Sequence, residues 1–229
     1  MMKKQTILFI HIKGGNKMIT RSWKNIVGVI SSCNRHTNGS KIILRVPISG
    51  LFDVDGKQHN DLITRIAPSS SGQYTSATAA GFNQATLFNG FSTSTNMYQT
   101  ECANSSEWQL CGGKSKIVFG TGSTPAKYTD YKLENPITEG ITGVEYYVAK
   151  SYNEDSNNYE SIITATFTST IDTTISEVGV VKSICNVSSY SDYEYPSYYY
   201  NVLAAREVLD TPINVKAGET FTVSMKIDI

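Results

Sequence analysis

A glycine-rich stretch in the middle of the chain, GTGSTPAKYTDYKLENPI at residues 120–137, follows an apolar run and suggests a phosphate-binding loop. A P-loop would need the pattern GxxxxGKS or GxxxxGKT and then a helix, because backbone N–H groups and the helix N-terminus hold the phosphate. Gly120 and Gly122 are followed by Ser-Thr-Pro instead, and a dinucleotide fingerprint would need glycine where Pro125 stands. The stretch therefore predicts a turn at the end of a strand rather than a nucleotide site.

Other sequence patterns that resemble metal-binding or catalytic motifs are incomplete. The segment Asp53-Val-Asp-Gly-Lys begins like a calcium loop, but that loop would need a bidentate Glu at Thr64. Its Asp-Gly pair instead predicts a turn at a hairpin tip. There is no GxSxG element, and His36 and His59 lie among polar residues typical of loops. The sequence therefore predicts no enzyme, no metal site and no cofactor.

The composition is that of a neutral chain with few charges. It has 229 residues, with 20 Lys and Arg against 20 Asp and Glu, and only 17% of its residues are charged. Such a chain has no charge excess to attract nucleic acid, and no apolar run reaches membrane-spanning length, so we expect neither partner. Cys102 and Cys111 could form a disulfide bond that closes a short loop in an oxidising medium. The favoured interpretation is that all four cysteines are reduced and partly buried.

The start of the chain suggests two features. The sequence KGGNKM, which ends at Met18, can be encoded by a bacterial ribosome-binding sequence followed by a start codon. Met18 is therefore interpreted as the true first residue, and residues 1–17 as a mis-annotated translated leader. This part also lacks the cleavage site of a signal peptide. Apolar residues at helical spacing then predict one short N-terminal helix or anchor within residues 18–34, with Thr20 or Ser22 as its N-cap.

Residues 35–229 are expected to form one all-β domain. Residues 163–171 and 221–229 alternate strictly between the two faces of a strand, as in a half-buried antiparallel sheet. Shorter strand candidates are found at residues 41–48, 175–181, 202–208 and 213–215. Several short strands at this spacing predict a β-sandwich or a barrel, and we favour an antiparallel β-sandwich with Greek-key-like connections. Residues 67–115, rich in Ser, Thr and Gly, are expected to form an excursion from its core.

The most unusual composition belongs to residues 188–201, which hold six tyrosines beside Ser, Asp and Pro. Tyrosine is favoured at recognition surfaces, because it offers a large and stiff contact that is apolar with one polar end. The segment is therefore either a partner or receptor contact, or a hairpin whose tyrosines cover their own sheet or a subunit interface. The candidate contact residues are Tyr190, Tyr193, Tyr195, Tyr198, Tyr199 and Tyr200.

The C-terminal half contains short motifs in a characteristic order. They are GTG at residues 120–122 with a Thr-Pro turn, ISEVG at 175–179, LAAR at 203–206 and KAGE at 216–219. This order resembles that of bacteriophage tail-collar and tail-fibre proteins and of similar head-fibre or appendage proteins of the virion. The resemblance covers about residues 115–229.

The resemblance implies a non-enzymatic structural protein of the virion, made in the host cytoplasm, that acts in particle assembly or host-surface contact. The implied partners are other virion proteins, further copies of the chain in a homo-oligomer, with a trimer expected, and a host-surface glycan. Zero net charge also leaves the free chain little protection from self-association. The alternative is a secreted or cell-surface carbohydrate-binding β-sandwich module, which would require a signal peptide or anchor.

Glu177 and Arg206 are the candidate structural ion pair. Glu177 stands inside an otherwise apolar strand segment, where an unpaired carboxylate is costly, and Arg206 is its natural partner. Gly120 and Gly122 are expected to allow a positive φ at the strand end, and Pro125 to fix the turn after it.

Overall fold

The computed structural model describes residues 6–12, 19–32, 42–66, 115–153, 158–186 and 198–228. The elements are β1 (Thr6–Ile12), α1 (Arg21–Ser32), β2 (Ile42–Phe52), β3 (Gln58–Ile66), β4 (Ser115–Gly120), β5 (Ile141–Asn153), β6 (Asn158–Ser169), β7 (Thr173–Asn186), β8 (Tyr198–Val215) and β9 (Thr220–Asp228). The predictions for the pair Cys102 and Cys111, and for the excursion before Ser115, lie outside the described residues.

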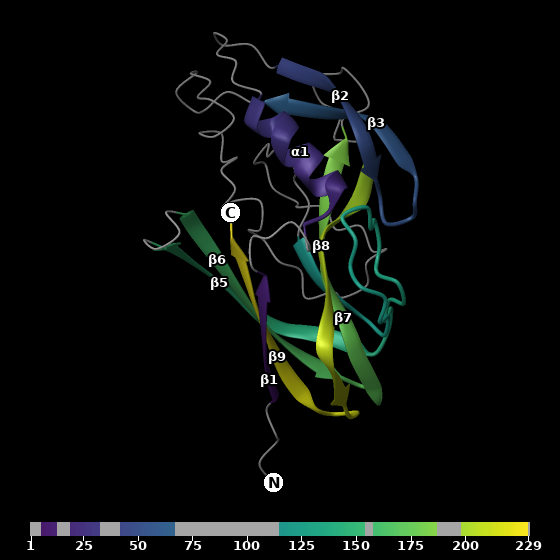
Figure 1. Ribbon diagram of the computed structural model, residues 1–229, viewed down its shortest axis with the longest axis vertical. Coiled ribbons are helices and arrows are strands. Elements are labelled where there is room, and N and C mark those ends of the chain that lie inside the picture. Colours follow the sequence, from purple (N-terminus) through teal and green to yellow (C-terminus); the bar gives the residue numbers. More distant parts are fainter. Residues whose placement is uncertain are drawn as a thin grey trace.

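The described strands form three sheets. One has the order β1-β9-β6-β5, a second the order β4-β7-β8, and β2 pairs with β3 alone. All pairings between these strands are antiparallel except that of β1 with β9. The molecule is elongated, with α1 and the β2–β3 hairpin at one end and the turn between β8 and β9 at the other (Figure 1). The prediction of an all-β fold with antiparallel sheets and one short helix is confirmed, while the β-sandwich arrangement and its Greek-key-like connections stay predictions.

The two larger sheets contact each other through aromatic side chains. The alternation predicted for β6 and β9 is present, with Phe167 and Phe221 buried on one face and Thr residues on the other. Phe119 of β4 packs edge-to-face against both rings, with centroid distances of 4.8 Å to Phe167 and 5.4 Å to Phe221. Edge-to-face contacts of this kind add to the free energy that area burial already supplies.

The β4-β7-β8 sheet is buried on its opposite face as well. A second apolar cluster there consists of Val54, Val118, Leu133, Val181 and Leu203. Leu133 comes from the irregular segment 121–140, which follows β4, and is fully buried. A Cβ atom at Gly179 would lie 3.0 Å from side-chain atoms of both Leu133 and Leu203. The absence of a side chain at this position of β7 therefore allows Leu133 to pack closely against the sheet.

The helix and the hairpin are fixed to the end of the long strand β8. Thr20 is the N-cap of α1, because its hydroxyl accepts a hydrogen bond from the N–H of Trp23 at 3.3 Å. The N–H of Thr20 donates to the carbonyl of Ala204 at 3.0 Å. The predicted hairpin turn is also present: Gly56 has φ +83° and its N–H donates to the carbonyl of Asp53 at 2.9 Å.

Three features of the fold differ from the sequence-based expectation. β5 was not predicted, because its residues do not alternate cleanly, and its ladder shifts register between Gly143 and Glu145. The separate candidates at 202–208 and 213–215 form one strand, β8, whose pairing with β7 shifts twice. The region interpreted as a translated leader contains β1, and the site where translation begins stays a prediction.

The contact between the sheets predicts the largest loss of stability for a single truncation. We expect Phe119→Ala to lower the free energy of unfolding by about 3–5 kcal/mol, because it removes a fully buried ring and leaves a cavity between the sheets. Denaturant unfolding followed by circular dichroism would measure this. The control is Val144→Ala, where the side chain is 58% exposed and the change should stay within about 0.5 kcal/mol. Equal effects of the two substitutions would contradict the assignment of this core.

Candidate functional site

The expected ion pair between Glu177 and Arg206 is present on the face of the β4-β7-β8 sheet that segment 121–140 covers. The Nε of Arg206 donates to Oε2 of Glu177 at 2.8 Å. The Glu177 side chain is fully buried, and that of Arg206 is 4% exposed. Two charges at this depth stabilise a fold only when further hydrogen bonds satisfy their remaining atoms.

Backbone groups of segment 121–140 supply those bonds to Glu177. Its Oε1 accepts from the N–H of Gly122 at 3.1 Å and of Asn135 at 2.8 Å. Its Oε2 accepts from the N–H of Glu134 at 3.1 Å as well as from Arg206. One carboxylate therefore holds two separate parts of the segment to β7, one at Gly122 and one at Glu134 and Asn135, and both of its oxygens are occupied.

Arg206 connects the middle of the same segment to β8. Its Nη1 lies 2.7 Å from Oδ2 of Asp130, and its Nη2 donates to the carbonyl of Thr124 at 3.1 Å. Burial alone would lower the pKa of Arg206, but the hydrogen bonds to Glu177 and Asp130 outweigh it and raise the pKa above its usual value. The guanidinium is thus a permanent cation with acceptors on each side.

Gly120 and Gly122 are required for a reason other than the expected one. Positive φ angles among the described glycines occur at Gly50, Gly56, Gly140 and Gly218, so the expectation for Gly120 and Gly122 is wrong. These two glycines instead allow close approach: a Cβ at Gly120 would lie 2.3 Å from Oε1 of Glu177, and one at Gly122 would lie 2.6 Å from it. A side chain at either position would displace the carboxylate that holds the segment. Pro125 is exposed within this segment.

The tyrosine segment is only partly described. Tyr190, Tyr193 and Tyr195 lie outside the described residues, and Tyr198 and Tyr199 begin β8, where they pair with Asn186 and Cys185.

Tyr200 is 7% exposed, and its ring stacks on that of His59 with a centroid distance of 3.9 Å. A residue this deeply buried is not available to a partner, so the contact prediction is wrong for Tyr200.

The same ring contact fixes the hairpin end of the molecule. Nε2 of His59 lies 2.8 Å from Oδ2 of Asp53, whose other oxygen accepts the N–H of Lys57 at 2.9 Å. The N–H of Val54 donates to the carbonyl of Asn201 in β8 at 2.9 Å. Asp53 and His59 therefore stabilise the turn and its contact with β8. This structural role differs from the calcium binding that the Asp-rich turn first suggests.

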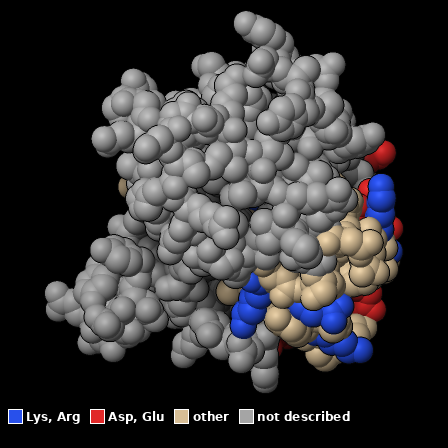
Figure 2. Space-filling view, turned by 90° about the horizontal axis from the view of Figure 1, so that it is seen from above, with Lys and Arg blue, Asp and Glu red and all other residues tan. Residues whose placement is uncertain are grey.

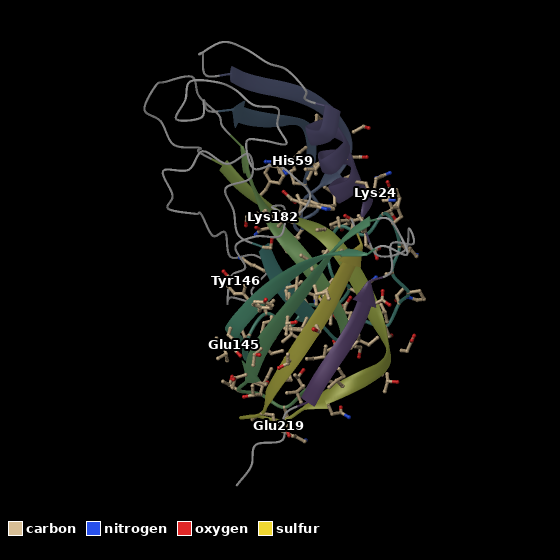
Figure 3. All side chains as sticks on the ribbon, turned by 90° about the vertical axis from the view of Figure 1, so that its left-hand side faces the viewer. Lys24, His59, Glu145, Tyr146, Lys182 and Glu219 are labelled. Atoms are coloured by element: carbon tan, nitrogen blue, oxygen red, sulfur yellow. The ribbon has the colours of Figure 1, made fainter. Side chains whose placement is uncertain are left out.

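An exposed strand edge, which the sequence analysis missed, is the most open apolar surface among the described residues. β5 ends the sheet order and pairs with β6 alone among the described strands. Val144, Tyr146 and Tyr147 are 58%, 43% and 68% exposed. Figure 3 shows Glu145 and Tyr146 on this edge, away from the hairpin end that His59 marks. The run GVEYYV, with adjacent tyrosines beside a valine, is the signal that could have identified it.

The outer face of the same sheet carries paired hydroxyl groups. Three cross-strand contacts between β6 and β9 form this ladder, Thr164 with Ser224 at 2.8 Å, Thr166 with Thr222 at 3.2 Å and Thr168 with Thr220 at 3.3 Å. Tyr147 is opposite Thr164 in the register of β5 and β6, so it stands on the same face at the rim of the ladder. The face combines hydroxyls with one exposed aromatic ring.

The ion pair can be tested with a double-mutant cycle. We expect Glu177→Ala and Arg206→Ala each to lower the free energy of unfolding by roughly 3 kcal/mol, because each leaves a buried charge without its partner. The two effects should be non-additive by about 1 kcal/mol or more, since the residues touch. Replacing both by apolar residues should recover only part of the loss, because three backbone N–H groups would remain without Glu177. Additive effects in denaturant unfolding would contradict a direct interaction.

Glu134 gives the segment a dependence on pH. Hydrogen bonds from the hydroxyl and then the N–H of Thr124 lower the pKa of Glu134 below its ordinary 4.5. A carboxylate of this kind stabilises the fold above its unfolded-state pKa, and the contribution is lost as the pH falls through the folded-state pKa. We expect Glu134→Gln to lower the Tm near neutral pH, with the difference from wild type shrinking toward about pH 3.

Thermal unfolding across that pH range would measure the effect, with Glu139→Gln as the control. Glu139 is an exposed carboxylate of the same segment. A Tm difference for Glu134→Gln that stays constant with pH would show that the carboxylate is not the group responsible.

Two further findings concern only the described residues: none of their His, Cys, Asp and Glu gather in a group that could hold a metal ion, and none of their helices is long and apolar enough to cross a membrane. Comparison with protein-family models, with curated proteins and with solved structures gives no match for this chain. The resemblance to virion proteins therefore stays a prediction.

Proposed function

We propose that this chain is a non-enzymatic structural protein of a bacteriophage virion, either a tail-fibre or collar component or a capsid-decorating appendage. The observation that supports this best is the convergence of three motifs. Gly120 and Gly122, the ISEVG strand with Glu177, and the LAAR segment with Arg206 all meet at one buried cluster. Motifs that resemble those of virion proteins thus have a common structural purpose here, which is to fix segment 121–140 on the sheet.

The cluster is suited to rigidity rather than to turnover. Both oxygens of Glu177 accept hydrogen bonds from the chain itself, and the side chain has no exposed surface. A catalytic carboxylate must reach a substrate, and this one is closed off by the segment that it holds. A long segment without helix or strand is in this way kept in one conformation, as an assembly component requires.

Self-association through the β5 edge is the second part of the proposal. Among the described strands β5 ends its sheet, and it exposes apolar side chains at this end, which are features of strand edges that pair with other chains. Identical copies can reuse one such patch in a closed symmetric oligomer. Figure 2 views the molecule from the end that carries α1 and the β2–β3 hairpin, and it shows Lys and Arg together with Asp and Glu among the described residues there, so this end offers no field of one sign for nucleic acid. A trimer is expected from the resemblance alone.

Carbohydrate binding is a second candidate, and the hydroxyl ladder favours it. A small-ligand site combines aromatic surface with a few polar groups, and Tyr147 stands at the rim of the partly buried Thr and Ser pairs. A glycan could be the host-surface contact of a virion protein or the ligand of a separate binding module. The two functions differ in where the protein is found.

Mass spectrometry of purified virus particles from a host culture that expresses this sequence would test the first part. We expect the chain to co-purify with capsid or tail proteins through a density gradient and to resist a salt wash. Its absence from the particles, together with secretion into the medium, would contradict the virion role and favour the carbohydrate-binding module.

Analytical ultracentrifugation at micromolar concentration would test the second part. We expect the wild type to sediment as an oligomer and Tyr147→Lys to shift it toward monomer, because a charge would be placed on the exposed edge. The matched control is Tyr128→Lys, which changes a tyrosine that is also exposed, by 39%, but lies in segment 121–140. An oligomer that survives Tyr147→Lys would remove β5 from the interface.

A further inference from the structure

We propose that the helix end of the molecule binds a sugar acid, that is, a glycan unit with a carboxylate, on a surface of aromatic rings and cations. The inference deepens the carbohydrate-binding part of the proposed function and rests on it. It places a site away from the hydroxyl ladder, since Figure 3 shows Lys24 on the side of the molecule away from Glu145 and Tyr146. The residues of this aromatic–cationic surface are Arg21, Lys24, Phe52, Tyr128, Tyr131 and Lys132.

Ring contacts connect four of these side chains in a row. The Cζ of Arg21 in α1 lies 5.9 Å from the ring centroid of Phe52 at the end of β2. The ring centroids of Phe52 and Tyr131 are 6.1 Å apart, and the Nζ of Lys132 lies 5.8 Å from the centroid of Tyr131. A helix, a strand and segment 121–140 therefore build one continuous surface, in which a cation stands at each end of two rings.

Lys24 and Tyr128 extend the row on the side of the helix. The Nζ of Lys24 lies 5.7 Å from the ring centroid of Tyr128, a distance at which a cation is attracted to the face of a ring. The N–H of Arg21 donates to the carbonyl of Tyr128 at 2.7 Å and so joins this pair to the row. Tyr128 is 39% exposed and Lys132 is also exposed, so a ligand can reach both a ring and a cation.

The carboxylates of the same segment are already bound by other groups. Asp130 accepts a hydrogen bond from Arg206 at 2.7 Å, and Glu134 accepts hydrogen bonds from the hydroxyl and the N–H of Thr124. The first turn of α1 contains no acidic residue. The Nε of Arg21 is buried and has no hydrogen-bond partner among the described residues. Positive charge on this surface is therefore left for an external anion.

The charges at this end favour a single carboxylate over a polyanion. Asp55 and Lys57 of the hairpin turn are exposed and opposite in sign, and Figure 2 shows both signs at this end. A nucleic acid gains affinity when several phosphates are neutralised together, whereas a carboxylate is bound by one or two nearby donors. A pyranose also has an apolar face of C–H groups that can lie on a tyrosine ring. The surface therefore fits a sugar acid better than a nucleic acid.

The experiment measures binding to the purified full chain by isothermal titration calorimetry at low ionic strength. The probes are oligosaccharides of galacturonic acid, of hyaluronan and of polysialic acid, each beside its methyl ester, which keeps the sugar and removes the charge. We expect at least one acid to bind about tenfold more tightly than its ester, and this preference to shrink as salt is added. If no acid binds more tightly than its ester, the proposal is overturned.

Two variants with the same loss of charge test the location. Lys132→Gln removes a cation of the aromatic–cationic surface and should weaken binding of the acid about fivefold without changing that of the ester. The matched control is Lys216→Gln, which removes a lysine that is 68% exposed in the turn between β8 and β9, at the other end of the molecule. It should leave both affinities as in wild type, and equal effects of the two variants would overturn the location. Tyr128→Ala should weaken both acid and ester, because it removes the exposed ring.

The remaining outcomes separate this inference from the proposed function. Tighter binding of an oligothymidylate than of every sugar acid would assign the surface to nucleic acid and overturn the proposal. Binding of sugars without any preference for acids, and abolished by Tyr147→Ala, would also overturn it but leave carbohydrate binding at the hydroxyl ladder standing. Acid binding that Lys132→Gln weakens, by a chain that is absent from virus particles, would support the site and contradict the virion role.

Discussion

The buried carboxylate of Glu177 is the constraint on which the rest of this side of the molecule depends. A charge without exposed surface must be fully satisfied, and here four donors satisfy it, three from the backbone and one from Arg206. The backbone donors come from segment 121–140, which has little regular secondary structure of its own. The cost of burying the charge is thus what fixes that segment's conformation.

Several neighbouring features follow from the position of this carboxylate. Gly120 and Gly122 must lack side chains, because a Cβ at either would collide with Oε1 of Glu177. Leu133, one residue before Glu134, enters the apolar cluster over Gly179 because the segment is held at both sides. Asp130 and Thr124 complete the surroundings of Arg206. The ion pair, the two glycines and the apolar packing in this region therefore depend on one another.

The parts of this arrangement differ in how far the sequence predicts them. A glutamate within an apolar strand has to find a cation, so the pairing of Glu177 with Arg206 could be expected from residue types alone. The strict alternation of β6 and β9 likewise identifies their buried faces. The role of Gly120 could not be read in this way, since close approach depends on where Asn135 and Glu177 lie in space. The exposed edge at Tyr147 was missed, because the run GVEYYV indicates exposed apolar residues but the order of strands, which puts β5 at the end of the sheet, is a property of the whole sheet.

The length of β8 has a mechanical consequence for the molecule. β8 has 18 residues and pairs with β7 along the body of the molecule (Figure 1). Near its start, the carbonyl of Asn201 holds the hairpin and that of Ala204 holds the beginning of α1. Tension applied between the helix end and the far turn would therefore act along the strand axis, and the β7–β8 ladder would be loaded in shear across many hydrogen bonds together. The helix end and the sheets would then resist a pull as one cooperative body instead of separating in sequence.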